Sequence, residues 1–243
     1  MLHGVPVPDE GPSGRSSVDA LRQYALSPLF IGLITALCLV VRALRTYAQV
    51  DPRYPFVGFN LLLAWIPLVL AYGVAALLRL SARRWLGFTA AVVDFAWLMF
   101  LPNAPYLVTD LVHLRDGVNG PNLVLLSLLA ITGLLIGVKA VQLVQGAIER
   151  LFGTTAGRRA VQLIALLAAC GVYLGRVVRW NSWTAIRHPH VLVHAIIRSP
   201  SDPDRLLAAL FGTAIFAIGF YVAYSLLARP RPTALPVRGE VAR

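Results

Sequence analysis

Apolar blocks of about 20 residues recur along this chain and restrict it to one class of fold. A helix needs about 20 residues to cross a ~30 Å hydrocarbon core, and lipid admits only helices and closed barrels. A barrel would alternate polar and apolar residues in short segments, which this sequence does not do. We therefore predict an all-α integral membrane bundle of about six transmembrane helices, over residues 28–47, 57–78, 86–101, 122–144, 160–180 and 205–227.

The composition supports this class and marks two tails. Hydrophobic residues make up 58% of the 243 residues and charged residues 14%, against roughly 25% charged in soluble domains. Residues 1–26 are rich in Gly, Pro and Ser and are predicted to be a disordered N-terminal tail. Residues 27–228 form the transmembrane domain, and residues 229–243 a basic, Pro-rich C-terminal tail.

The net charge of +11 comes almost entirely from arginine. In a soluble protein this charge would suggest nucleic acid as a partner. Beside apolar helices it favours anionic lipid headgroups instead, because arginines that flank spanning helices set topology and meet lipid phosphates. Slightly more arginines lie on the side of both termini than on the opposite side, which predicts that both termini are cytoplasmic.

The stretch FLPNAPYLVTDLVHL, residues 100–114, adds polar and ionisable side chains to the end of the third block. Pro102 and Pro105 cannot continue a regular helix, so the third span is predicted to kink or end there. Asn103 lies where freed backbone carbonyls need donors. Beyond the break, helical spacing puts three side chains on one face: Tyr106, Asp110 and His113. The pattern predicts a short amphipathic helix at, or dipping into, the outer membrane interface.

A second stretch, GVYLGRVVRWNSW over residues 171–183, ends the fifth block on the same side of the membrane. Arg176 and Arg179 lie one turn apart there, and Asn181 follows. Two glycine pairs with GxxxG spacing predict close helix packing. These pairs are Gly133 with Gly137 and Gly171 with Gly175.

The polar residues on this side are predicted to form one net-positive pocket, one or two turns below the membrane surface. Arg42, Arg45 and Asn60 lie at a similar level. Guanidinium groups bind phosphate and carboxylate through paired hydrogen bonds, so the expected ligand is an anionic small molecule or a lipid headgroup. The predicted ligand-binding residues are Asn103, Tyr106, Asp110, His113, Arg176, Arg179 and Asn181.

A plain structural alternative stays open for each of these residues. The prolines and Asn103 could simply end one helix and cap the next. Asp110 and His113 could be a solvated helix face, and the arginines could reach lipid phosphates without a specific ligand. No cofactor or metal is expected, because His190 and His194 have the spacing of a metal pair but lack the Glu of HExxH.

Two charges lie inside the apolar blocks. Asp94 is midway along the third block and Lys139 is in the cytoplasmic half of the fourth. Counted from the cytoplasmic ends, their depths differ by about 5 Å, since a helix rises 1.5 Å per residue. A lone charge in lipid is costly, so we predict an intramembrane ion pair, with a proton or ion path as the alternative.

Several of these stretches resemble a known family. RYPFVGFNLLLAWIPL, WLMFLPNAPYLVTDLVHL, ITGLLIGVKAV and GVYLGRVVRWNSW occur in this order. They resemble the signature blocks of a bacterial membrane family catalogued as domain of unknown function 1361, over residues 50–225. The resemblance implies a multi-pass protein of the bacterial inner membrane and no particular activity.

Two functions are consistent with these residues. The first is binding or transport of an anionic group at the arginines. The second is a membrane-embedded enzyme acting on a lipid-linked substrate, with Asp110 and His113 as catalytic acid and base. The chain has no GxSxG or HExxH motif, which favours the first. Six spans without an internal repeat are a small body for a carrier, so a carrier would have to form a homo-oligomer.

Overall fold

The computed structural model describes residues 13–48, 56–80, 84–116, 120–176 and 203–228, and its elements there are all helices. In this part of the chain six segments are long and apolar enough to cross a membrane, which confirms the predicted all-α bundle. The elements are α1 (Ser13–Ala25), α2 (Pro28–Tyr47), α3 (Phe56–Leu80), α4 (Arg84–Phe100), α5 (Asn103–Thr109), the 3-10 helix η1 (Asp110–Asp116), α6 (Gly120–Phe152), α7 (Thr154–Arg176) and α10 (Pro203–Leu227).

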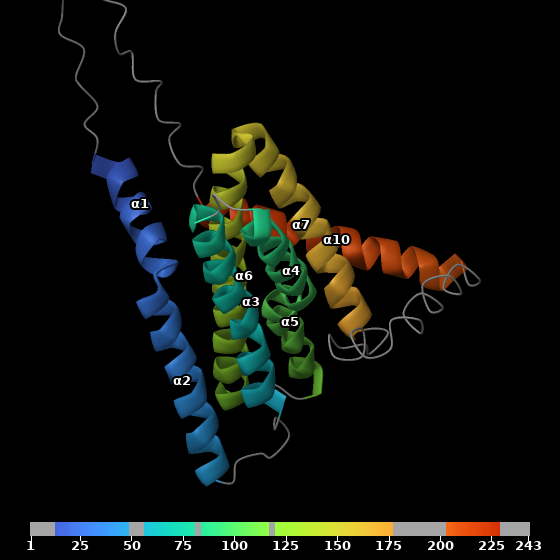
Figure 1. Cartoon of the computed structure of the whole chain (residues 1–243). Helices are drawn as coiled ribbons and strands as arrows, with labels where there is room; N and C mark the ends of the chain where they lie inside the picture. The colour runs from blue at the N-terminus through green and yellow to red at the C-terminus, as the bar shows by residue number, and fades with distance from the viewer. Residues whose placement is uncertain (1–12, 49–55, 81–83, 117–119, 177–202, 229–243) are drawn as a thin grey trace, which may run out of the picture.

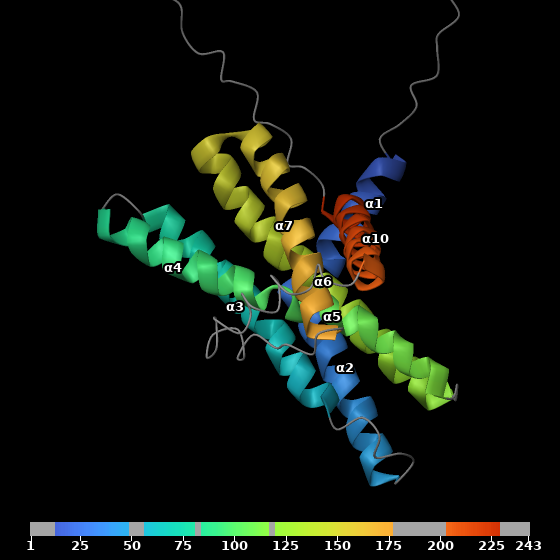
Figure 2. The same ribbon diagram turned by 90° about the vertical axis from the view of Figure 1, so that its right-hand side faces the viewer.

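The bundle is assembled around α6, whose 33 residues make it the longest described helix. It packs against α2, α3, α5, α7 and α10. Two thirds of the residues in its most apolar stretch are buried. Figures 1 and 2 show α3 and α4 side by side, with α10 crossing the bundle at a steep angle in Figure 1. Because α6 is about 50 Å long at 1.5 Å per residue, it extends beyond a ~30 Å hydrocarbon core.

The third crossing consists of three helical pieces. α4 ends at Phe100, α5 begins at Asn103 and η1 continues to Asp116, and the apolar crossing runs over Val92–Arg115. Pro102 and Pro105 have no N–H to donate, so the regular hydrogen-bond ladder stops between the pieces. The Asn103 side-chain amide donates to the Phe100 carbonyl at 2.9 Å. The predicted break is therefore confirmed, and Asn103 satisfies one of the carbonyls next to it.

The short helix that follows the break packs inside the bundle. Ala104, Pro105 and Leu107 are buried, and α5 packs against α3, α6 and α7. Its partners on α6 are Gly133 and Gly137, close to the middle of that helix. The break therefore lies about halfway along the apolar segment Val92–Arg115.

The predicted packing glycines provide the space for this arrangement. Gly133 faces Ala104 and Leu107, and Gly137 faces Pro105 and Phe220 of α10. On α7, Gly171 faces the ring of Pro102. A side chain at these positions would occupy the volume that the broken segment fills. The GxxxG spacing thus marks the positions where α5 and the preceding proline pack.

Residues 13–25 form a regular helix, α1, within the segment 1–26 that was predicted to be disordered. The helix ends at Ala25, and Ser27 has an extended backbone conformation. The Ser27 hydroxyl accepts a hydrogen bond from Phe30 N and so caps α2. Leu26 is buried in the core. The prediction of disorder is therefore wrong for these residues.

A network of polar contacts ties α10 to the C-terminal part of α6. Tyr224 of α10 is hydrogen-bonded to the Gln145 side-chain oxygen, and Gln145 Nε2 donates to Glu149 Oε1 at 2.7 Å. Tyr224 and Gln145 are buried. The Glu149 side chain lies over Gly157 in the first turns of α7. This network joins α6, α7 and α10 where the chain turns at Gly153.

Candidate functional site

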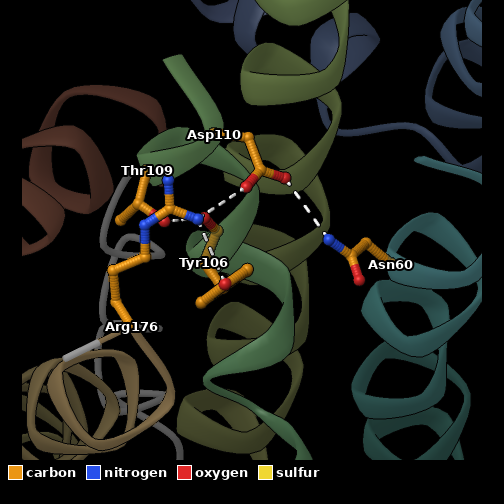
Figure 3. Close-up of polar contacts among 5 residues, drawn as sticks. All are labelled: Asn60, Tyr106, Thr109, Asp110 and Arg176. Atoms are coloured by element: carbon orange, nitrogen blue, oxygen red, sulfur yellow. Dashed lines mark hydrogen bonds and ion pairs between the residues drawn. The ribbon is translucent and has the colours of Figure 1, made fainter. Parts of the chain in front are cut away.

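Asp110 is the centre of a polar cluster at the junction of α5 and η1. The residue is 1% exposed, and both carboxylate oxygens accept hydrogen bonds from other helices (Figure 3). Asn60 Nδ2 of α3 lies 3.4 Å from Oδ2, and Arg176 Nη1 of α7 lies 3.2 Å from Oδ1. A buried carboxylate without such partners is strongly destabilising, so Asp110 binds three parts of the bundle together.

Arg176 is held from two sides at the end of α7. Its Nη1 donates to Asp110 and also to the Tyr106 hydroxyl, at 3.2 Å in each case. The guanidinium carbon lies 5.6 Å from the centre of the Tyr106 ring, a geometry that adds a cation–π attraction. The side chain remains 27% exposed. The cluster thus contains a guanidinium that is fixed in direction and still reachable.

The local sequence explains how Tyr106 and Asp110 come to face the same partner. They are four residues apart, Tyr106 in α5 and Asp110 at the start of η1. The Thr109 hydroxyl donates to the Tyr106 carbonyl at 2.6 Å. From Asp110 the chain tightens into η1, and in a 3-10 helix residues three apart are eclipsed. His113 therefore follows Asp110 on the same face, and its ring lies 5.3 Å from the ring of Phe56 at the start of α3.

The predicted site residues separate into three groups. The structure brings Tyr106, Asp110 and Arg176 into contact, with His113 on the next turn of η1. It gives Asn103 a backbone partner at Phe100. Arg179 and Asn181, like His190 and His194, lie outside the described residues.

A second guanidinium lies near the same end of the bundle. Arg42 of α2 approaches Gly58 in the first turn of α3, where its Nη1 lies 3.4 Å from the position of a Cβ. Asn60, which binds Asp110, follows two residues later. Arg42 and Arg176 therefore both add positive charge around the start of α3 and the end of α7.

The described contacts do not test the predicted ion pair between Asp94 and Lys139. Among the described residues, ion pairs join Arg22 to Asp19 and Arg176 to Asp110. Lys139 Nζ donates to Gln142 Oε1 on its own helix at 3.2 Å. The depth estimate matched the two residues along the membrane normal, but α4 packs mainly on α3 and on α7.

We expect Asp94→Asn and Lys139→Gln to act independently on stability. Changes at sites that share no contact add to within about 0.3–0.5 kcal/mol. The test measures the free energy of unfolding of both single variants and of the double variant in mixed micelles of detergent and SDS. A double variant clearly more stable than the sum of its parts would support the ion pair.

Sequence reasoning missed the contact between Gln145 and Tyr224. The available signal was the presence of Gln145 and Glu149, one turn apart, in a mainly apolar helix. Polar side chains within a span usually face a neighbouring helix rather than lipid. That rule predicts a partner for Gln145 but not that it comes from α10.

Comparison with protein families matches residues 59–218 to the family described as "Protein of unknown function (DUF1361)". The matched range includes Asn60, Tyr106, Asp110 and Arg176, the residues whose side chains make up the cluster. Comparisons with curated proteins and with solved structures gave no match. Since residues 59–218 are well over half of the 243-residue chain, it belongs to the DUF1361 family, and its fold is a multi-pass helical membrane bundle.

Proposed function

We propose that this protein binds an anionic group at the Arg176 guanidinium, and holds or transports it. The expected ligand is a phosphate, free or in a phospholipid headgroup. With both termini cytoplasmic, as the distribution of arginines suggests, Arg176 belongs to the extracytoplasmic face of the bacterial cytoplasmic membrane. Binding there requires no metal or cofactor.

The observation that carries the proposal is how Arg176 uses its donors. A guanidinium has five N–H groups in one plane, and the described contacts of Arg176, to Asp110 and to Tyr106, both use Nη1. The side chain is 27% exposed. Asp110 and Tyr106 thus fix the direction of the plane while its other edge can bind two oxygens of a phosphate.

The same geometry favours binding over catalysis by Asp110 and His113. A general base must come within hydrogen-bond reach of the proton that it removes. Asp110 is 1% exposed, and its two oxygens already accept hydrogen bonds from Asn60 and Arg176. This carboxylate is placed to orient an arginine rather than to exchange protons with a substrate.

The proposal is tested by the affinity of purified protein for phosphatidylglycerol and, separately, for inorganic phosphate. We expect Arg176→Lys to weaken binding roughly tenfold, because lysine keeps the charge and loses the planar fork. Arg22→Lys is the matched control, since Arg22 lies on α1 beside Asp19, and should bind like the wild type. Native mass spectrometry of the lipid complex and calorimetry with phosphate give the two affinities.

The two ligands distinguish the source of the anion. Loss of phosphatidylglycerol binding alone would assign Arg176 to a lipid headgroup, and loss of phosphate binding would assign it to a free anion. Equal affinities of wild type and Arg176→Lys for both probes would contradict the proposal.

A further inference from the structure

Helix α1 has an apolar side that the rest of the described protein does not cover. Val18, Leu21 and Tyr24 are spaced three residues apart and are 46%, 68% and 54% exposed. Helical spacing puts them on one side. Asp19 and Gln23 lie on the other side, and Arg22 lies at its edge, where Arg22 Nη1 is 3.7 Å from Asp19 Oδ1. The helix is therefore amphipathic, and its apolar side is largely exposed in the described part of the chain.

A helix of this kind needs a surface to pack on. α1 has 13 residues, and isolated helices shorter than about 12–15 residues are marginal in water. The principal described contact of α1 is with α2, through the end of the helix, where the Tyr24 and Phe30 rings lie 4.9 Å apart. In its middle turns, Val18 and Leu21 are exposed to 46% and 68% in the described part of the chain.

The position of α1 along the chain identifies the available surface. α2 begins at Pro28 and has 20 residues, which span about 30 Å, the thickness of the hydrocarbon core. The beginning of α2 therefore lies at the membrane surface, and α1 precedes it by two residues, Leu26 and Ser27. Ser27 has an extended backbone conformation that separates the axes of the two helices.

We propose that α1 is an in-plane anchor, lying along the surface of a phospholipid bilayer with Val18, Leu21 and Tyr24 inserted among the lipids. Short helices with one apolar and one polar side bind membranes in this way, and tyrosine is enriched at the boundary between lipid and water. Asp19 offsets the charge of Arg22, so we expect the attraction to be mainly apolar and a neutral phospholipid surface to be sufficient. The anchor sets the level at which α2 enters the membrane.

The test compares the two sides of α1 in the full-length protein. Cys38 and Cys170 are replaced by alanine, and single cysteines are introduced as Leu21→Cys or as Gln23→Cys. Each is labelled with the fluorophore NBD and reconstituted into phosphatidylcholine vesicles, with and without phosphatidylglycerol. Quenching by spin-labelled lipid reports contact with the bilayer, and quenching by iodide reports contact with water. Val18→Cys repeats the measurement for the apolar side.

We expect position 21 to emit at shorter wavelength than position 23 and to be quenched several-fold more strongly by the spin-labelled lipid. Position 23 should be quenched mainly by iodide, and phosphatidylglycerol should change neither result. Three outcomes would overturn the proposal. Equal iodide quenching at both positions would show α1 in water, and protection of position 21 from both quenchers would show it covered by protein, including a second copy of this chain. Lipid contact only with phosphatidylglycerol would show an electrostatic attachment.

Discussion

Gly133→Ala is expected to disrupt the packing of the broken span more than any other change of one methyl group at the described glycines of α6. A Cβ at position 133 would lie 2.4 Å from the Ala104 carbonyl oxygen and 2.6 Å from Leu107 Cβ. These contacts involve backbone and the first side-chain atom, which cannot move without moving α5. Overpacking typically costs about 1–3 kcal/mol, and we expect a loss of stability at the upper end of that range.

The matched control is Gly219→Ala in α10, where a Cβ meets nothing within 4 Å. Alanine in a helix is favoured over glycine by about 0.5–1 kcal/mol, so this change should be neutral or slightly stabilising. The free energy of unfolding in mixed micelles with SDS measures both variants. Equal effects at positions 133 and 219 would contradict the close contact between α5 and α6.

Arg176→Met is expected to destabilise the protein more than Asp110→Asn. Methionine leaves the Asp110 carboxylate at 1% exposure with a hydrogen bond from Asn60 but no cation, and removing one partner of a buried pair costs about 3–5 kcal/mol. The loss of stability in Arg176→Met should fall at the lower end of this range, because Arg176 is 27% exposed and its charge is already partly solvated. Asp110→Asn leaves an arginine that can turn towards water or lipid phosphate.

The informative result is which of the two variants, Arg176→Met or Asp110→Asn, loses more free energy of unfolding. The same unfolding measurement gives both, and near-UV circular dichroism checks that each variant retains its tertiary packing. A larger loss for Asp110→Asn would mean that the carboxylate stabilises the fold through Asn60 and α3 rather than through Arg176 and α7.

The features that the sequence predicts correctly are local or compositional. The spans follow from the length of apolar blocks, and the break at residues 101–105 follows from the missing N–H groups of Pro102 and Pro105. The meeting of Tyr106, Asp110 and Arg176 could be anticipated because helical spacing put Tyr106 and Asp110 on one face. The connection after the third block also lies on the same side of the membrane as the end of the fifth.

The features that it does not predict depend on which helix lies beside which. Spacing shows that Tyr106 and Leu107 belong to different faces of α5, but not that the Leu107 face meets Gly133 in the middle of α6. For the same reason, equal depth alone does not make Asp94 and Lys139 neighbours. Gln145 and Tyr224 are 79 residues apart in sequence, and no local pattern connects them.

Helix α1 was missed for a different reason. Averaging the composition of residues 1–26 mixes a Gly- and Pro-rich beginning with the amphipathic segment that follows it. A shorter window would have shown Val18, Leu21 and Tyr24 at helical spacing, which is the pattern of a surface helix.

The central claim is that the broken third span meets α7 through Asp110 and Arg176. A double-mutant cycle of Asp110→Asn and Arg176→Met tests it most directly, with the coupling free energy taken from the unfolding of both single variants and the double variant. Residues in direct contact couple by about 0.5–3 kcal/mol, and we expect a value above 1 kcal/mol, with the double variant more stable than Arg176→Met alone. Losses that simply add, with a coupling below about 0.5 kcal/mol, would show that the two residues do not interact.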